Sequence, residues 1–547
     1  MTATWTNYGE VFTRRWVVEA LLDLTGYDAS VDLGSLRVVE PSCGSGAFLG
    51  PAVERLIASA TARGRDLGTL GDAIRAYDLR PENVERARAR CIELLVGAGV
   101  ERSMSEELAR DWVRQADFLL EALEPESVDA VFGNPPYIRY DDLPDDVAAA
   151  YRESWSTMRG RGDIYVGFFE RALAMLRPGG RVGFICADRW MRNQYGSVLR
   201  RFVTSRFSVE HVWTMHDVDA FDAVVSAYPA ITVLANHKQG PVVVADTTAE
   251  FGPSSAQALV KWSRDESLTA FSDTGVQAHR LPHWFDGAES WPTGSPARLA
   301  LIELLTDRFD PLHDPATGTK VSIGVATGAD KVYVIDDPSL VESDRALPLA
   351  MRKDLASGRF EWQGSYLVNP WDDEGNLVPL EEFPRLARYL AAHPALRNRF
   401  VAKKDPGAWY RTIDKVHAEL TPRPKLMLQD MKAFINPVLE PGGHYPHHNL
   451  YYVTSETWDM EVLGGLLLSR IAQAFVEAHC VRMRGGTLRF QSQYLKKIRV
   501  PRSESLNPRT AEALRNAFRA RDVEGATLAA AEAYGIDPFS YELVSAA

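Results

Sequence analysis

The first half of this 547-residue chain predicts an α/β fold built on a doubly wound, mostly parallel sheet. Short apolar runs typical of buried strands alternate with helical patterns from about residue 36 to residue 235, as in parallel sheets flanked by helices. A glycine-rich turn follows the first of these strands, and polar residues follow several of the others. Because ligands of open α/β sheets bind at the carboxyl ends of the strands, these residues also predict where a binding site lies.

Composition and charge indicate a globular protein of the cytoplasm. The chain is too long for one hydrophobic core, so its length predicts two or three domains. Apolar residues make up 46% and charged residues 24% of the sequence, and no apolar run has the length of a signal peptide or a membrane span. The four cysteines show no paired spacing, which predicts neither disulfides nor a zinc site. The net charge of -12 argues only weakly against a polyanionic partner, since basic residues gathered on one face matter more.

Residues 128–137 form an apolar strand that stops at two prolines. Pro135 and Pro136 cannot donate to a ladder, so the strand ends in a rigid tip that carries the Asn134 amide and the Tyr137 ring. The Asn134 oxygen and the Pro135 carbonyl can both accept hydrogen bonds from one exocyclic amino group, while the ring stacks on a planar base. An aryl amine is a poor nucleophile, and two such acceptors would localise its lone pair. This tip is therefore predicted to be catalytic.

A glycine-rich turn over residues 40–49 predicts a cofactor site. Gly44 and Gly46 would let the backbone approach a ligand closely, with N–H groups exposed at the start of a helix. The G-x-G-x-x-G spacing of dinucleotide-binding turns is absent. Asp78 ends the second strand, where a ribose diol would be held, and a helix cap is its alternative role. Asp117 follows a further strand end.

Three of these motifs resemble those of the S-adenosylmethionine-dependent N6-adenine DNA methyltransferases of the gamma (TaqI-like) class. They are Glu40-Pro41-Ser42-Cys43-Gly44-Ser45-Gly46 followed by Phe48, the pair Asp117-Phe118, and Asn134-Pro135-Pro136-Tyr137. The resemblance implies a Rossmann-like class I methyltransferase sheet with S-adenosylmethionine as cofactor. It also implies that a methyl group is transferred to the N6 of an adenine in double-stranded DNA, after the base has been flipped out of the duplex.

The resemblance further implies roles for single residues. Thr13 would touch the methionine end of the cofactor, and Asp78 would hold the ribose hydroxyls. Asp117, with Phe118 beside it, would accept from the adenine amino group of the cofactor. Phe221 stands where the family has a second aromatic residue against the flipped base. The predicted catalytic residues are Asn134, Pro135, Pro136, Tyr137 and Phe221, and the predicted cofactor-binding residues are Thr13, Glu40, Pro41, Cys43, Gly44, Gly46, Asp78, Asp117 and Phe118.

A stretch rich in glycine, proline and serine over residues 287–295 predicts a domain boundary. We therefore expect a catalytic methyltransferase domain over residues 1–245, a connecting segment over 246–297, and a mixed α+β target-recognition domain over 298–547. The third region resembles the C-terminal specificity domain of the same family in three stretches, 321–333, Trp409-Tyr410 and 485–490.

Basic residues in the second half predict contacts with DNA phosphates. Residues 481–502 hold seven basic and no acidic residues, and residues 397–432 hold nine basic residues with aromatic residues between them. Such stretches suit the phosphate contacts that position a duplex, with a solvated surface as the alternative. The residues expected to contact DNA are Trp409, Tyr410, Lys425, Arg482, Arg484, Arg489, Lys496 and Lys497.

Alternatives remain for a metal site and for the function. His444, His447 and His448 cluster in a loop rich in proline and glycine, but no acid or cysteine stands at metal spacing nearby, so we expect a surface loop and no metal. One rival function is methylation of another planar amine or amide, on an RNA base or a protein glutamine. Another is a non-catalytic DNA-binding subunit that keeps the fold. A separately encoded restriction endonuclease is compatible with the sequence as a partner but is not visible in it.

Overall fold

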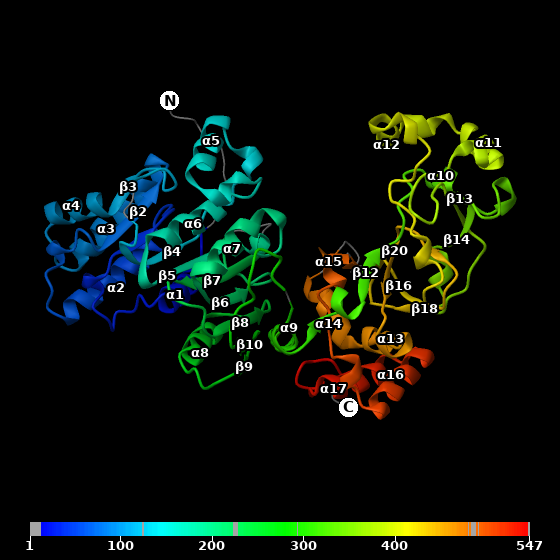
Figure 1. The fold of residues 1–547 in the computed structure, drawn as a ribbon. Helices are drawn as coiled ribbons and strands as arrows, with labels where there is room; N and C mark the ends of the chain where they lie inside the picture. The colour runs from blue at the N-terminus through cyan, green and yellow to red at the C-terminus, as the bar shows by residue number, and fades with distance from the viewer. Residues whose placement is uncertain are drawn as a thin grey trace. The chain divides into compact units, whose positions relative to one another are not determined.

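The computed structural model describes residues 12–122, 125–222, 228–292, 294–479, 481–482, 488–490 and 492–544, with only the backbone at 431–432, 481–482 and 488–489. The chain divides into two compact units, Met1–Ala300 and Leu301–Ala547 (Figure 1). Among the described residues, every helix is too short or too polar to cross a membrane.

The first unit is built on one ten-stranded sheet with the order β3-β2-β1-β4-β5-β7-β6-β8-β10-β9. Its strands are β1 (Val38–Glu40), β2 (Ile74–Asp78), β3 (Val113–Gln115), β4 (Val128–Gly133), β5 (Leu176–Ala187), β6 (Ser208–Thr214), β7 (Pro229–Ala235), β8 (Val242–Thr247), β9 (Ala270–Asp273) and β10 (Val276–Leu281). The neighbours from β3 to β5 pair in parallel, whereas β7 runs antiparallel to both β5 and β6. This arrangement confirms the predicted doubly wound α/β fold.

Helices cover both faces of this sheet (Figure 1). They are α1 (Arg15–Leu24), α2 (Leu49–Ala62), α3 (Pro81–Gly97), α4 (Arg102–Trp112), α5 (Asp145–Ser154), α6 (Tyr165–Met175), α7 (Ser197–Arg206) and α8 (Pro253–Ser263). Val38 belongs to the core under α1 to α4, and Val39 belongs to the opposite core under α5 to α7. Successive strand residues point to opposite faces, so a strand such as β1 contributes to both cores.

The strand order reverses between β1 and β4, and this reversal positions the site. The chain runs outward from β1 to β2 and β3, then returns to β4 on the other side of β1. Val39 pairs with both Arg75 and Val131, so the three strands end at one edge of the sheet. A crevice opens at such a switch point, outside the carboxyl ends of the strands.

Residues 246–297, expected to connect two domains, lie largely within the first unit, so this part of the predicted division is wrong. β10 pairs antiparallel with β8 and β9, which extends the sheet, and α8 packs against α1. The boundary between the two units falls between residues 300 and 301 of the chain, inside α9 (Pro296–Arg308). The sequence did not reveal β9 because that strand is short and mostly exposed, so it contains no apolar run.

The second unit is an α+β assembly of small sheets and helices (Figure 1). One four-stranded sheet contains β12 (Lys320–Ile323), β20 (Leu450–Thr454), β16 (Lys425–Gln429) and β18 (Val438–Glu440), and another contains β13 (Val334–Ile335), β15 (Tyr366–Val368), β14 (Ala346–Ala350) and β19 (Tyr445–Pro446). The smaller sheets pair β11 (Asp310–Pro311) with β23 (Arg499–Val500), and β17 (Met431–Lys432) with β22 (Leu488–Arg489) and β21 (Val481–Arg482). The helices after α9 are α10 (Asp330–Tyr333), α11 (Pro384–Ala391), α12 (Phe400–Lys404), α13 (Met460–Leu468), α14 (Arg470–His479), α15 (Ser492–Leu495), α16 (Pro508–Ala520) and α17 (Val523–Tyr534).

Candidate active site

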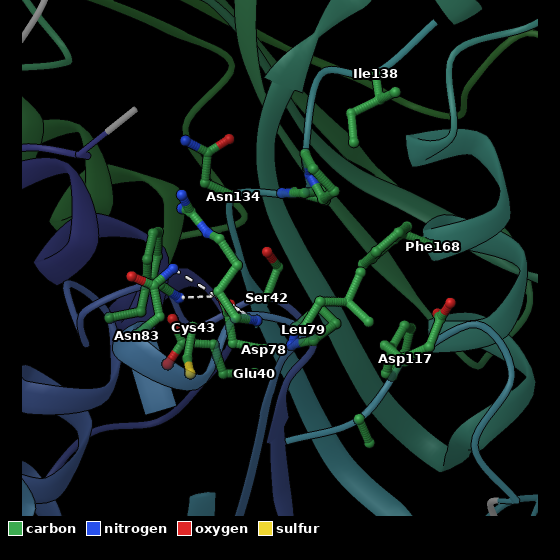
Figure 2. A pocket seen from close by; sticks show the side chains of 18 of the residues that line it. Glu40, Ser42, Cys43, Asp78, Leu79, Asn83, Asp117, Asn134, Ile138 and Phe168 are labelled. Carbon is green, nitrogen blue, oxygen red and sulfur yellow. Dashed lines mark hydrogen bonds between the residues drawn. The ribbon is translucent and has the colours of Figure 1, made fainter. Parts of the chain in front are cut away.

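A cavity of about 720 Å³ lies at the carboxyl edge of the sheet in the first unit (Figure 2). This volume falls among those of small-molecule sites, which run from about 300 to 1,000 Å³. The sequence-predicted residues that line it are Thr13, Glu40, Pro41, Cys43, Gly44, Asp78, Asp117, Phe118, Asn134, Pro135, Pro136 and Tyr137. Gly46 and Phe221 are not among the lining residues.

The glycine-rich turn forms one wall of the cavity. Gly44 and Gly46 have φ angles of 52° and 95°, in the left-handed region that favours glycine. The Cys43 backbone N–H donates to the Tyr77 carbonyl at 2.8 Å, which holds the turn against β2. Burial raises the pKa of the Cys43 thiol well above its ordinary value. Burial thus disfavours the thiolate, which is the nucleophilic form of cysteine.

Asp78 joins this turn to the start of α3. Its Oδ2 accepts from the Gly44 backbone N–H at 2.9 Å. Its Oδ1 accepts from the Arg80 backbone N–H at 2.9 Å and from Asn83 Nδ2 at 3.2 Å. The N-cap residue of α3 is Arg80, which has no side-chain cap hydrogen bond, so Asp78 does not fill the capping role that was the alternative to cofactor binding. Each carboxylate oxygen can accept more than one hydrogen bond, so these contacts are compatible with a ligand as well.

Asp117 and Phe118 lie on the opposite wall, next to residues that sequence reasoning missed. Asp117 Oδ2 accepts from the Tyr151 hydroxyl at 2.7 Å, and its Oδ1 accepts from the Leu119 backbone N–H at 2.9 Å. The Phe118 and Phe168 rings stack at 5.3 Å. Tyr151 and Phe168 lie on helices whose apolar pattern looks like ordinary core, so nothing in the sequence marked them. Leu79, Ile138 and Ile164 are further lining residues that were not predicted.

The Asn134 tip lies at the end of β4 and holds four of the five predicted catalytic residues, all but Phe221. Asn134 Nδ2 donates to the Thr13 hydroxyl at 3.3 Å, which directs the amide oxygen to the other side (Figure 2). The Tyr137 ring meets the Tyr165 ring edge-on at 6.5 Å, and the Tyr165 and Tyr195 hydroxyls lie 2.6 Å apart. Burial raises the pKa of Tyr137 well above its ordinary value, so this ring stays neutral.

Comparisons with known proteins decide the family. Residues 79–221 match the family model described as Eco57I restriction-modification methylase. The chain is 41% identical over 551 residues to the type II methyltransferase M.XhoI of Xanthomonas vasicola, and this match covers 98% of this chain and 99% of that protein. This chain belongs to the type II methyltransferases of restriction-modification systems. It is also 42% identical over 535 residues to M.PaeR7I of Pseudomonas aeruginosa (96% and 92% covered) and 36% identical over 547 residues to M.BstVI of Geobacillus stearothermophilus (98% of each).

Membership of this DNA methyltransferase family confirms the prediction of S-adenosylmethionine as cofactor. The cavity fits that ligand in its chemistry. Glu40 is 1% exposed, and its Oε2 lacks a hydrogen-bond partner among the described residues, as expected of an atom that awaits a ligand. Burial and the neighbouring Asp78 raise the pKa of Glu40 well above its ordinary value. A cationic ligand beside it would lower that pKa again.

The structure places Phe221 outside the cavity of this type II methyltransferase. Its side chain is 6% exposed and belongs to the core that α1 also joins. Its backbone forms an isolated bridge with Thr13, and the Arg14 N–H donates to the Ala220 carbonyl at 3.0 Å. Phe221 thus holds the segment that carries Thr13, and its ring is not among the lining of the cavity. The glycine Gly46 likewise shapes the turn without lining the cavity.

Lys425 was expected to contact DNA, and this prediction is wrong. It lies on β16, whose five residues are all buried, and its side chain is fully buried. Its Nζ donates to Glu440 Oε2 at 2.5 Å and also to the Thr421 and His444 carbonyls. Charge alone suggested a surface residue, but a lysine can occupy a central strand when a buried carboxylate pairs with it.

The other predicted DNA contacts of the type II methyltransferase vary in exposure. Trp409 and Tyr410 are half-buried; the Arg397 guanidinium lies 3.9 Å from the Trp409 ring centroid, and the Tyr410 hydroxyl donates to the Val378 carbonyl at 2.8 Å. Lys496 and Lys497 are half-buried. Arg484 lies outside the described residues, and only the backbone of Arg482 and Arg489 is described. Among the side chains that the structure describes in the first basic stretch of this unit, the exposed basic ones are Arg397, Lys403, Lys404, Lys415 and Arg423.

Proposed function

We propose that this enzyme transfers the methyl group of S-adenosylmethionine to the N6 amino group of an adenine in double-stranded DNA, with the base flipped out of the duplex. The observation that supports this most is the Asn134 amide, in contact with Thr13, in the lining of the cavity that Asp117 and Phe118 also line. This arrangement brings an acceptor for a planar amine next to a predicted cofactor site.

The chemistry rests on two acceptors at the end of β4. The Asn134 side-chain oxygen and the Pro135 carbonyl would each accept one N6 hydrogen, which localises the nitrogen lone pair and directs it at the methyl group. Bound S-adenosylmethionine supplies an activated methyl group on a sulfonium, which is a good leaving group. Catalysis is therefore mainly alignment of nitrogen, methyl and sulfur in one line. The Thr13 hydroxyl serves this alignment because it accepts a hydrogen bond from the Asn134 side chain and so limits the rotation of that side chain.

Base flipping requires a compensating contact in the site. Removing an adenine from the duplex costs a few kcal/mol of stacking and pairing, and stacking on an aromatic side chain returns about 1–3 kcal/mol per base. Tyr137 lines the cavity three residues after Asn134, and the Tyr165 ring supports it edge-on. Since the Phe221 ring is buried elsewhere, we assign the stacking role to Tyr137 alone.

The cofactor's adenine and ribose are assigned to opposite walls. The pair Asp117 and Phe118, extended by Phe168, offers an acceptor for an amino group beside stacked aromatic rings. Asp78 lies at the end of the neighbouring strand. Its carboxylate would accept hydrogen bonds from the ribose hydroxyls in addition to the one from the Gly44 N–H. Cofactor binding by these residues is thus a matter of hydrogen bonds and stacking.

The two compact units support a division of labour. The first unit would carry the chemistry, and the second would recognise the target sequence as a specificity domain. Its exposed basic residues suit phosphate contacts, which position a duplex without reading its sequence. A separately encoded restriction endonuclease that cuts the same sequence when it is unmethylated is the partner that such a methyltransferase implies.

The test is a methylation assay with radiolabelled S-adenosylmethionine on duplex DNA, followed by digestion to nucleosides and mass spectrometry. We expect the label in N6-methyladenine, in a fixed sequence context. Label in a methylated cytosine would overturn the adenine assignment. Label in RNA or protein, with DNA unmodified, would favour the rival planar amines and amides. Cofactor binding without any transfer would favour the non-catalytic subunit.

A further inference from the structure

Two histidines and an aspartate that are far apart in the sequence come together in the second unit. His447 Nε2 lies 3.2 Å from Asp330 Oδ2, and His448 Nδ1 lies 3.1 Å from His447 Nε2. One potential ligand atom from each residue lies within 4.8 Å of the others. The sequence placed no acid near the histidines, because Asp330 reaches them only through the fold.

The backbone around this cluster is firmly held. Val325 forms a parallel bridge with His447; its N–H donates to the Pro446 carbonyl at 2.9 Å, and the His448 N–H donates to the Val325 carbonyl at 3.1 Å. A Cβ atom at Gly324 would lie 2.3 Å from the His447 carbonyl oxygen, so only glycine permits this approach. The three ligand atoms are therefore preorganised, with little backbone freedom to lose on binding.

The Asp330 carboxylate is oriented by a buried residue. The Thr327 hydroxyl, on a side chain with no exposed surface, donates to Asp330 Oδ1, while the other oxygen faces His447. Metal-ligating carboxylates usually have such a second hydrogen bond, which fixes the ligating oxygen. His447 is 2% exposed, whereas Asp330 and His448 are exposed, so an ion could enter from solvent and keep water ligands.

We propose that Asp330, His447 and His448 bind a divalent transition-metal ion such as Zn²⁺, with water completing the coordination. For ligand distances of about 2.0–2.2 Å, neighbouring ligands around one ion are separated by roughly 2.8–3.6 Å in octahedral or tetrahedral geometry. The two separations from His447 Nε2, 3.2 Å to Asp330 Oδ2 and 3.1 Å to His448 Nδ1, fall in this interval. Two imidazoles with a single carboxylate favour Zn²⁺, Co²⁺ or Ni²⁺ over Mg²⁺ or Ca²⁺, which prefer oxygen ligands. The ion would clasp the 324–330 loop to the 446–448 segment, and this role does not depend on the DNA reaction.

Without an ion, a proton on His447 Nε2 can be donated in a hydrogen bond to Asp330 Oδ2 or to His448 Nδ1, which accounts for the same short distances. Metal and proton would then compete for the site, so affinity should fall as the pH is lowered. The test is titration of the full-length, metal-stripped protein with CoCl₂, followed by the visible d–d absorption, and calorimetry with ZnCl₂. We expect one equivalent bound in the wild type, with Zn²⁺ displacing Co²⁺.

The variants are His448→Ala and Asp330→Asn, with His417→Ala as the matched control that removes an exposed histidine elsewhere in this unit. We expect each of the first two to weaken Co²⁺ affinity at least about tenfold and His417→Ala to bind as the wild type does. Asn at position 330 can still accept from Thr327, so this variant removes the charge with the least disturbance. Circular dichroism without metal checks folding. Absence of d–d bands in the wild type, or equal affinity in all four proteins, would overturn the proposal.

Discussion

The carboxyl edge of the first sheet and the basic stretches of the second unit were both predicted as functional surfaces, with different outcomes. At the sheet edge, residues from four strand ends line one cavity. In the second unit, Lys425 is buried in an ion pair and the Tyr410 hydroxyl is bound to a backbone carbonyl. A motif at a strand end therefore predicts where its side chains lie in the fold. A run of like charges shows that basic residues are frequent there, but it does not predict which of them are exposed.

The physical reason lies in what fixes each surface. Parallel pairing brings every strand end to the same edge, so Asp78, Asp117 and Asn134 converge whatever the loops between them do. A basic run crosses strands, turns and short helices, and each element turns its own side chains toward solvent or core. Four predictions test this contrast, from the largest expected effect to the smallest.

Replacing Lys425 by Met should have the largest effect of the four changes, as a loss of folding stability. The change leaves the Glu440 carboxylate buried without its cationic partner, and breaking a buried ion pair in this way costs about 3–5 kcal/mol in the free energy of unfolding. Urea denaturation followed by circular dichroism would measure it. The double variant Lys425→Met with Glu440→Gln should recover part of the loss. Wild-type stability together with weaker binding to every DNA sequence would return Lys425 to the role predicted from the sequence.

Replacing Asn134 by Ala should abolish most of the activity without loss of cofactor binding. Removal of one preorganised acceptor from a transition state lowers kcat by about 10²–10³-fold. Turnover measured with radiolabelled cofactor should fall, whereas the cofactor affinity measured by calorimetry should stay the same. Asn193→Ala, an exposed asparagine of the same unit, is the matched control. Near-normal turnover of Asn134→Ala would remove the amide from the mechanism.

Replacing Asp117 by Ala should weaken S-adenosylmethionine binding by about 1.5–3 kcal/mol, the contribution of a hydrogen bond to a charged group. Tyr151→Phe keeps the ring and removes only the hydroxyl that donates to Asp117, so its effect should be smaller, about 0.5–1.5 kcal/mol. Calorimetry on both variants would show whether Asp117→Ala loses more cofactor affinity than Tyr151→Phe. DNA affinity without cofactor should not change, and equal cofactor affinity in all three proteins would make Asp117 purely structural.

The mildest expected effect concerns phosphate contacts. If Lys496 and Lys497 each touch a phosphate, their joint replacement by Ala should reduce the slope of log K against log salt by about 1.8. The pair Lys403 and Lys404, exposed in the other basic stretch, offers a matched double variant. Titrations at several salt concentrations on cognate and scrambled duplexes would compare them. A change in slope only for Lys403 and Lys404 would move the duplex to the first stretch.

The local sequence was sufficient to predict features that depend only on residues next to one another in the chain. The double proline after β4 ends that strand wherever it packs, and the two glycines of the 40–49 turn require left-handed backbone angles. The alternation of strands and helices likewise predicted the doubly wound sheet. The cofactor and the broader assignment to the DNA methyltransferases followed from the resemblance of these same motifs, which combine the chemistry with its position.

Only the tertiary structure decided the side-chain contacts between residues that are far apart in the sequence. The hydroxyl of Tyr151 finds Asp117, the Phe221 ring enters the core instead of the cavity, and Glu440 makes a buried Lys425 stable. Asp330 meets His447 in the same way. These contacts join segments brought together by strand pairing and side-chain packing, and neither hydropathy nor spacing along the chain encodes which distant side chain will be the neighbour.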